Sequence, residues 1–452
     1  MSVPNPRRRR CGHWIPCALL ALGAGTLVSC DSGPASARTV SDDPALPTAP
    51  FTDYRAEAPG TSRKIGAADL PQPYATRAAR NSARIVPRPA AAWPKAPAGF
   101  KVDLYSTAVP MPRALRTAPN GDVFVAASNR GEVHVLRGPG ADGKPEQSAV
   151  FARGLHQPFG LAFYPPGASP QWLYVGSHDS IDRFAYQNGD LEARGEPEHI
   201  ADLPGGGHST RDIRFSPDGK SMYVAVGSAS NVDDPDTTPG EKHRANILAL
   251  NPDGSGLRVF ASGIRNPVGL AVQPETGALW CSVNERDDLG DNLVPDYITR
   301  VQDGGFYGWP WWYIGAHQDP RHEGKRRDLK DKVIVPDVLI QPHSASLQLT
   351  FYDGGQFPAP YRGDIFAAEH GSWNKAQRAG YEVIRVPLHQ AGKAGGEYED
   401  FITGFVLDNG DVWGRPVGVA VAKDGSLLVS DDASSSIWRV SYAGASATAA
   451  VH

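Results

Sequence analysis

The sequence is poor in cysteine and shows no excess of positive charge, and each shortage excludes a class of protein. Its 4 cysteines are Cys11, Cys17, Cys30 and Cys281, and they form neither a C-x-x-C-H motif nor a zinc-ligand spacing. Covalent haem and structural zinc sites of those patterns are therefore excluded. The net charge of −4 over 452 residues gives no indication of nucleic-acid binding. Glycine (49) and proline (40) are abundant, so frequent turns and few long helices are expected.

A sustained apolar stretch at the N-terminus is typical of an export signal. Arg7 to Arg10 precede "CGHWIPCALLALGAGTLVSC", which is too short and too rich in glycine to predict a membrane span. The stretch ends in "LVSC", which resembles a bacterial lipobox, and so predicts that residues 1–30 form a lipoprotein signal with Cys30 as the lipid-modified first residue. The alternative is a plain secretory signal that is cleaved nearby. Either signal predicts export, and the lipobox predicts a lipid-anchored protein of the cell envelope or periplasm.

Composition then divides the remainder of the chain. Residues 31–92 are rich in Ala, Pro, Ser and Arg without periodicity, which predicts a tether whose later part packs along the domain edge. The folded body is predicted over residues 93–442 and a short tail over 443–452. Cys281 follows Trp280 in a strand pattern, which predicts a small buried hydrophobe rather than half of a disulfide.

One pattern recurs through the body. A short strand of small apolar residues leads to a turn of the Pro-Asp-Gly kind, then to a second apolar strand and a third that ends in a motif such as I-x-R-V. The six copies begin at Arg113, Pro158, Arg211, Arg265, Leu347 and Arg415. Small residues suit the crowded innermost strand of a propeller blade. The repeats therefore predict an all-β fold, a six-bladed β-propeller of four-stranded antiparallel blades.

Basic residues recur just before the innermost strands. Four copies place an arginine there, namely Arg113, Arg211, Arg265 and Arg415; His343 stands close before the fifth strand, and His156 and Gln157 before the second. Guanidinium groups that converge on one axial opening would repel one another without an anion between them. A planar polycarboxylate would satisfy them, because arginine pairs bidentately with carboxylates. The alternative is that each arginine caps its own blade.

Two further segments carry candidate chemistry. His208 lies in "LPGGGHSTRD", where a flexible glycine-rich backbone can present an imidazole as a general base. The run "NERDDLGDN" offers closely spaced oxygen ligands for a hard cation such as calcium, although it could equally be a solvated loop.

The string "RNPVGLAVQPETGALWCSVNERDDLGDN", together with "GGFYGWP" at Gly304 to Pro310, resembles the soluble pyrroloquinoline-quinone (PQQ)-dependent glucose/sorbosone dehydrogenases, and the sorbosone branch more than the glucose enzymes. The resemblance implies PQQ and Ca²⁺ as cofactors, with His208 and Arg265 as the catalytic pair. It also implies that Glu285 and Arg286 hold calcium through their backbone carbonyls. Further cofactor contacts are implied for Asn266, Asn284, Lys375, Arg378 and Arg415, beside the Arg113, Arg211 and His343 of the basic ring.

Two departures from the family pattern are visible. Glu285-Arg286 stand where the glucose enzymes carry Gly-Pro, although a backbone carbonyl survives that change. Gly227-Ser228 stand where a carboxylate should orient the base, so either Asn231, Asp233 or Asp234 replaces it or His208 is less well held.

The expected activity is oxidation of an aldose, sugar aldehyde or similar polyol-type substrate, with electrons passing to an external quinone or cytochrome. The alternatives are a calcium-dependent sugar lactone hydrolase and a non-catalytic propeller scaffold.

Overall fold

The computed structural model describes residues 49–138, 140, 143–389 and 392–444, all within the unit from Leu46 to His452. The predicted signal segment with Cys30, residues 31–48 of the predicted tether and residues 445–452 of the predicted tail lie outside the described residues. Within the described part of the chain, no helix is long and apolar enough to cross a membrane.

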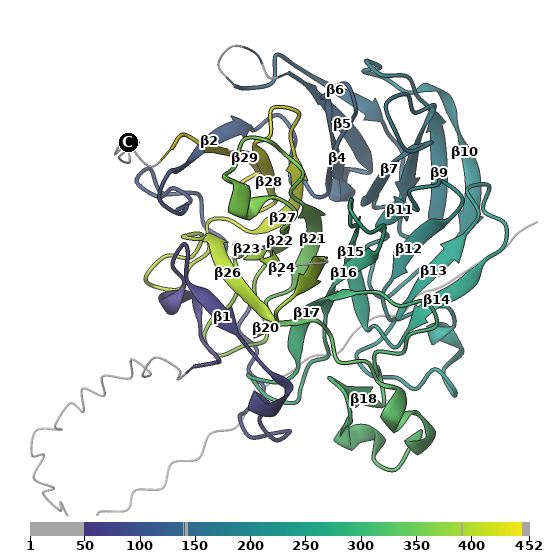
Figure 1. The fold of residues 1–452 in the computed structure, drawn as a ribbon, viewed down its shortest axis with the longest axis vertical. Helices are drawn as coiled ribbons and strands as arrows, with labels where there is room; N and C mark the ends of the chain where they lie inside the picture. The colour runs from purple at the N-terminus through teal and green to yellow at the C-terminus, as the bar shows by residue number, and fades with distance from the viewer. Residues whose placement is uncertain (1–48, 139, 141–142, 390–391, 445–452) are drawn as a thin grey trace, which may run out of the picture. The chain divides into compact units, whose positions relative to one another are not determined.

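Six four-stranded antiparallel sheets surround a common axis, which confirms the predicted six-bladed β-propeller (Figure 1). Each of the six sequence copies supplies the innermost strand of one blade. From the axis outward, the first three blades are β3 (Leu115–Thr117), β4 (Val123–Ala127), β5 (Glu132–Arg137) and β6 (Gln147–Ala152); β7 (Gly160–Tyr164), β8 (Trp172–Gly176), β9 (Ser180–Ala185) and β10 (Arg194–Asp202); and β11 (Ile213–Phe215), β12 (Met222–Val226), β13 (Asn246–Leu250) and β14 (Arg258–Ser262).

The other three blades follow the same outward order. They are β15 (Asn266–Val272), β16 (Leu279–Asn284), β17 (Pro295–Arg300) and β20 (Val338–Pro342); β21 (Ser346–Phe351), β22 (Ile365–Glu369), β23 (Glu382–Val386) and β26 (Glu397–Ile402); and β27 (Pro416–Val421), β28 (Leu427–Asp431), β29 (Ser436–Tyr442) and β2 (Phe100–Ser106). Two small hairpins, β18 (Trp312–Tyr313) with β19 (His317–Gln318) and β24 (Leu388–His389) with β25 (Lys393–Ala394), decorate the ring. In the described part of the chain, seven short 3-10 helices lie at Tyr54–Ala56, Ala67–Asp69, Ser128–Arg130, Pro239–Glu241, Pro320–His322, Arg327–Lys332 and Ala359–Tyr361.

The two ends of the body close the ring in the sixth blade. Strand β2 precedes the first blade in sequence but pairs antiparallel with β29, with Phe100 opposite Tyr442. Because the last blade takes its outermost strand from the N-terminal side of the body, the backbone hydrogen bonds within this one sheet tie the two ends of the body together.

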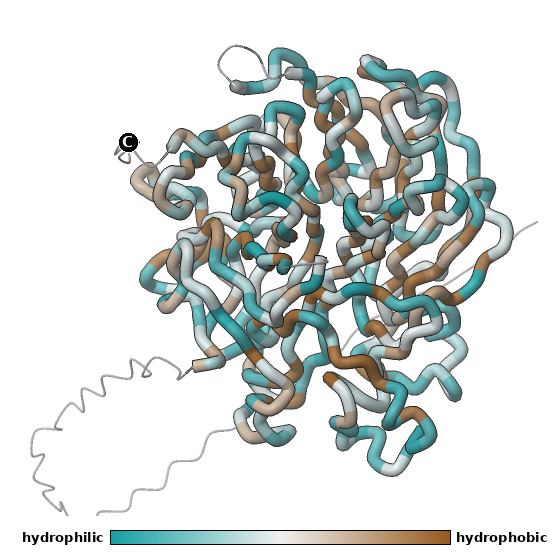
Figure 2. Tube along the Cα trace, viewed as in Figure 1, coloured by the Kyte–Doolittle hydropathy of each residue, from teal (hydrophilic) through white to brown (hydrophobic). Residues whose placement is uncertain are grey.

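Apolar side chains fill the spaces between blades. Six clusters of buried residues each lie between a pair of neighbouring blades. Brown, hydrophobic segments accordingly run mainly along the strands, and teal segments occupy the connecting turns (Figure 2). Cys281 belongs to one of these clusters and is fully buried as a free thiol, as predicted.

Glycines in the innermost strands have a steric cause. A Cβ atom at Gly160 would lie 2.1 Å from the carbonyl oxygen of Arg211, and one at Gly269 would lie 2.5 Å from that of Leu347. The innermost strands of neighbouring blades therefore approach too closely for any side chain at these positions.

Residues 49–92 differ from the predicted tether. Strand β1 (Ser62–Lys64) pairs with β26 and adds a fifth strand to the fifth blade. The backbone N–H of Asn81 donates to the carbonyl of Trp373, and the carbonyl of Asn81 accepts from the side chain of Arg378. This segment has no hydrophobic periodicity, but its backbone polar groups form hydrogen bonds with the loops of the ring. Hydrophobic periodicity alone does not predict such packing.

Candidate functional site

The candidate site forms at the end of the ring where the innermost strands begin, called the mouth below. In each blade the first strand begins and the second strand ends at this same end, because the two strands are antiparallel. Residues before the first strand and residues after the second strand therefore meet there. Arg113 and Arg415 belong to the former group, and His370 and Asp432 to the latter.

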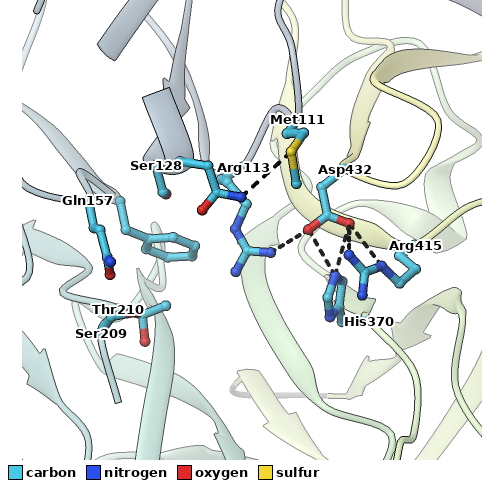
Figure 3. A pocket seen from close by; sticks show the side chains of 11 residues that line it. Met111, Arg113, Ser128, Gln157, Ser209, Thr210, His370, Arg415 and Asp432 are labelled. Carbon is cyan, nitrogen blue, oxygen red and sulfur yellow. Dashed lines mark hydrogen bonds and ion pairs between the residues drawn. The ribbon is translucent and has the colours of Figure 1, made fainter. Parts of the chain in front are cut away.

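A cavity of about 260 Å³ opens at the mouth. Residues from five blades line it: Met111, Arg113, Ser128, Asn129, Gln157, Phe159, Ser209, Thr210, His370, Arg415 and Asp432 (Figure 3). Asp432 lies between three basic side chains in this view. It accepts hydrogen bonds from Arg113 Nη1 (2.7 Å), Arg415 Nε (3.1 Å) and His370 Nε2 (3.0 Å).

The charges of this cavity do not cancel. Burial disfavours the carboxylate of Asp432, but His370, Arg113 and Arg415 outweigh that cost and hold its pKa well below the usual value. Burial also lowers the pKa of His370, so its imidazole is neutral at pH 7. Two guanidinium groups and one carboxylate leave an excess of one positive charge, which suits an anionic ligand group.

His208 lies beside this cavity, directly before the lining residue Ser209. Its Nδ1 is 2.8 Å from the carbonyl oxygen of Ser228, and a carbonyl can only accept, so Nδ1 carries the proton and Nε2 is the basic nitrogen. Burial and the charge of Arg265 lower the pKa of His208 to about 4. The imidazole is therefore neutral, as a general base must be.

The residue that orients the base differs from the expected ones. The main-chain carbonyl of Ser228, and not Asn231, Asp233 or Asp234, takes the place of the expected carboxylate. Asn231 instead contacts Arg265.

Gly227 allows His208 and Asn266 to pack together. A Cβ at residue 227 would lie 2.2 Å from Asn266 Oδ1 and 2.7 Å from the Cβ of His208. Asn266 Nδ2 donates to Asn284 Oδ1 at 3.3 Å, whereas Asn266 Oδ1 is buried without a hydrogen-bond partner. A buried carboxamide with an unpaired atom beside the base is a position for a polar ligand group.

The arginines of the predicted ring divide into two kinds. Arg113 and Arg415 converge on the cavity, as predicted. Arg211 is fully buried and donates to the carbonyls of His208, Thr210 and Pro204, so it holds the loop of the base and caps its own blade.

Arg265 is held mainly by the protein itself. Its Nη1 donates to the carbonyl of Glu285 (2.7 Å), and its Nη2 donates to the side chains of Asn231 and Asp287 (both 3.0 Å). The charge that was predicted to need a ligand anion is thus paired with Asp287, a residue that the sequence prediction did not assign.

Of the remaining predicted cofactor residues, His343 lies near Asp287, with its Nδ1 3.9 Å from Asp287 Oδ1. Asn374 donates to Asp287 and to Nδ1 of His343, while Nε2 of His343 donates to the carbonyl of Gly290. Burial lowers the pKa of His343, which keeps this imidazole neutral.

Lys375 and Arg378 contact the N-terminal segment. Lys375 is 4% exposed, its Nζ lies 3.4 Å from the carbonyl of Thr52, and burial lowers its pKa to about 8. Arg378 donates to the carbonyls of Asn81, Ser82 and Gly410. Arg378 therefore anchors the segment that was predicted to be a tether.

The predicted calcium turn is rigid. The Arg286 side chain is fully buried and donates to the Glu285 and Asp319 carboxylates and to the carbonyls of Pro310 and Trp312. One lone pair of the Glu285 carbonyl accepts from Arg265, which leaves one for another donor or for a cation. Among the described residues, no three His, Cys, Asp or Glu side chains form a metal-binding group.

Sequence reasoning missed Asp432 and His370. Both follow the second strand of their blades, the same position as Glu285 in the fourth blade. The repeat pattern therefore marks the residues that directly follow the second strand of each blade as candidate site residues.

Comparisons with known proteins find similarity to sugar dehydrogenases. Residues 109–372 match the family model described as Glucose / Sorbosone dehydrogenase, and residues 315–443 match one described as TrAA12-like. An uncharacterized protein of Borreliella burgdorferi is 28% identical over 364 residues, which cover 77% of this chain and 90% of that protein. A pyrroloquinoline quinone-dependent pyranose dehydrogenase of Coprinopsis cinerea is 24% identical over 75% of this chain, which spans only about half (53%) of that relative.

A solved structure shares the fold. The holo form of the PQQ domain of pyranose dehydrogenase from Coprinopsis cinerea superposes with a TM-score of 0.66 at 22% identity, over 80% of this chain and 100% of that one.

Proposed function

The chain belongs to the glucose/sorbosone dehydrogenase family, and from that premise we propose that it is an exported PQQ-dependent dehydrogenase that oxidises an aldose, a sugar aldehyde or a similar polyol-type substrate. The observation that carries the proposal is the neutral imidazole of His208, which lies beside the unpaired carboxamide oxygen of Asn266 at the mouth. The closer likeness to the sorbosone branch stays a prediction.

The residues at the mouth fit PQQ. The cofactor is a flat polycarboxylate, and the cavity carries one uncompensated positive charge from Arg113 and Arg415. The carboxamide oxygen of Asn266 offers an acceptor to a ligand, because Asn266 Nδ2 already donates to Asn284 Oδ1 and Asn284 Nδ2 donates to the carbonyl of Ser346. Arg113, Arg415 and Asn266 would hold the cofactor, with Asn284 fixing the amide of Asn266.

The chain offers fewer ligand atoms to a calcium ion than it offers to PQQ. The carbonyls of Glu285 and Arg286 are its proposed ligands, and a hard cation requires six to eight oxygens. The chain supplies too few of these at the turn by itself, so we expect calcium to bind only when the cofactor and water complete its shell.

The chain's own residues perform the proton chemistry. PQQ, when bound, supplies the acceptor for the two electrons that leave the substrate carbon as hydride. His208 Nε2 removes the proton of the substrate hydroxyl, while Nδ1–H remains bonded to the Ser228 carbonyl and keeps the ring in the productive tautomer. Arg211 fixes the loop on which His208 stands through the carbonyl of residue 208. An aldose ring would leave as a lactone, and an aldehyde hydrate would leave as an acid.

The electrons are proposed to pass to an external quinone or cytochrome. The lipobox at Cys30 supports attachment to the membrane of the cell envelope, where such acceptors are found.

Reconstitution with PQQ tests the proposal. The purified chain with PQQ and calcium should reduce a dye in the presence of aldoses. His208→Gln should keep PQQ affinity, measured by absorbance, while kcat falls by about 10² to 10⁴-fold because the general base is lost. His199→Gln, an exposed histidine of β10, is the matched control and should be unchanged. Normal turnover by His208→Gln would remove His208 from the mechanism, and lactone hydrolysis without PQQ would replace the proposal with a hydrolase.

A further inference from the structure

The partner of the His208 ring lies in a loop without regular structure. Ser228 stands two residues after the end of β12, and its carbonyl accepts from Nδ1 of His208 (2.8 Å). Ser228 Oγ lies 3.2 Å from the same nitrogen and donates its own proton to the carbonyl of Ser230 (2.6 Å), so this hydroxyl can also only accept from Nδ1. The Nδ1–H tautomer of His208 therefore depends on where residues 228–230, called the acceptor loop below, are held.

The carboxylate of Glu241 holds the acceptor loop. Glu241 ends a short 3-10 helix and is 2% exposed. Its Oε2 accepts from the backbone N–H of Ala229 (2.9 Å), and its Oε1 accepts from the backbone N–H of Ser230 (2.8 Å) and from Ser230 Oγ (2.7 Å). An ionised carboxylate only accepts, so all three donors match it. These bonds fix the two residues that directly follow Ser228.

Arg244 fastens the other side of the same contact. It is 3% exposed, and its backbone N–H donates to the carbonyl of Glu241 (3.0 Å). Its Nη1 donates to the carbonyl of Gly227 (2.9 Å), and its Nη2 donates to the carbonyls of residues 204–206, the glycine-rich approach to His208. One short segment, residues 241–244, thus binds both the loop that carries the base and the loop that carries its acceptor.

We propose that Glu241 is a positioning residue for the base, because its carboxylate holds the Ser228 carbonyl against Nδ1 of His208 through the acceptor loop. The inference rests on the proposed function, in which Nε2 of His208 removes the substrate proton. The sequence has no carboxylate at Gly227-Ser228, where one is expected to orient the base. Glu241 supplies a carboxylate from further along the chain, and it acts on the partner of the imidazole instead of on the imidazole itself.

Glu241→Gln tests the proposal because it changes one acceptor into a donor. Whichever way the new amide turns, its NH2 group faces a backbone N–H of Ala229 or Ser230, so the acceptor loop must move. Without a fixed acceptor, the neutral ring of His208 should populate both tautomers. Nitrogen NMR of the histidine-labelled apo-chain measures the tautomers, and His208→Gln assigns the signals. After reconstitution with PQQ, kcat should fall by about 10- to 100-fold, while KM and PQQ affinity change by less than about twofold.

Asp337→Asn is the matched control. Asp337 Oδ2 accepts from the backbone N–H of Arg300 and from Oγ1 of Thr299 (both 2.8 Å), at the end of β17 that lies away from the mouth. This variant also places an amide where a carboxylate accepts a backbone N–H and a hydroxyl. It should therefore lower Tm, as Glu241→Gln does, but keep the wild-type tautomer and kcat.

A second variant covers the case in which Glu241→Gln does not fold. Ser230→Ala removes the hydroxyl donor and leaves both backbone donors to Glu241, so it should show the same change of tautomer to a smaller extent. A wild-type tautomer in folded Glu241→Gln, or in Ser230→Ala where the first variant is unfolded, would overturn the proposal. A wild-type chain that reduces no dye with PQQ would overturn the proposed function instead, and the tautomer of the apo-chain would still test the role of Glu241.

Discussion

Neutralising Asp432 should lower the stability of the protein and raise its affinity for PQQ. It is the one carboxylate among the eleven residues that line the cavity, and it binds both Arg113 and Arg415. Asp432→Asn keeps the shape of the side chain and removes its charge. The net charge of the cavity then rises from one positive charge to two.

The expected loss of stability follows from exposure. Breaking a fully buried ion pair costs about 3 to 5 kcal/mol. Here the side chain of Asp432 is 4% exposed, but those of Arg113 and Arg415 are 18% and 28% exposed, so water recovers part of the cost. We expect the free energy of unfolding at pH 7 to fall by about 2 to 3 kcal/mol. Because the native pKa of Asp432 lies below its unfolded value, the gap to the wild type should narrow as the pH falls below about 4.

The expected gain in affinity follows from Coulomb's law. For a ligand carboxylate about 8 Å from the removed charge, at an effective dielectric constant of about 20, the change is about 2 kcal/mol, or roughly thirtyfold in Kd. PQQ titration at low and high salt measures this gain, which should shrink as salt increases.

A matched control separates charge from general damage. Asp122→Asn breaks a similar pair with Arg137 at the opposite end of β4, so it should lose stability without any change in PQQ affinity. Weaker PQQ binding by a folded Asp432→Asn variant would refute the argument from charge, since it would show that Asp432 serves to hold the arginines in position.

Three further expectations concern the base and the calcium turn. Because the pKa of His208 is lowered to about 4 and the neutral form is the base, kcat/KM should stay constant from pH 7 downward and fall only below about pH 4; a fall that begins near pH 6.5 would contradict the buried position of the imidazole. Gly227→Ala should reduce both PQQ affinity and kcat by at least about tenfold, because its Cβ collides with Asn266 and His208, whereas Gly240→Ala, with no heavy atom within 4 Å of the new Cβ, should be neutral in both assays. Calcium affinity, measured by equilibrium dialysis, should be weak for the apo-chain and stronger with PQQ present; equal affinity in both states would indicate a complete protein site.

The fold was predictable because its signals are repeated. Each blade repeats a short strand of small residues followed by a turn and a second apolar strand, so six independent copies predict the same architecture. The packing of residues 49–92 was not predictable in this way. That segment forms its contacts through backbone groups and isolated side chains, such as the carbonyls of Asn81 and Ser82 that bind Arg378.

The site was predictable in position but only partly in its contacts. Residues before the innermost strands do gather at one end, and His208 does stand there as a neutral base. Arg211 donates to a carbonyl of its own loop, whereas Arg265 pairs with an acid of the same blade, Asp287. The sequence does not show which of these two partners an arginine has. These outcomes depend on side-chain geometry within a few ångströms.

The pairing of charges within the protein changes how ligand specificity must arise. Arg265 donates to Glu285, Asn231 and Asp287. Its guanidinium group therefore fixes the loop of the fourth blade and is not available to pair with a ligand anion. Specific recognition then falls to the few groups that the fold leaves unpaired. At the mouth these are the carboxamide oxygen of Asn266 and the single excess charge beside Asp432. A ligand that fits the mouth must therefore present a polar atom to Asn266 and a negative group to Arg113 and Arg415 at once, which a flat polycarboxylate can do and a neutral sugar alone cannot.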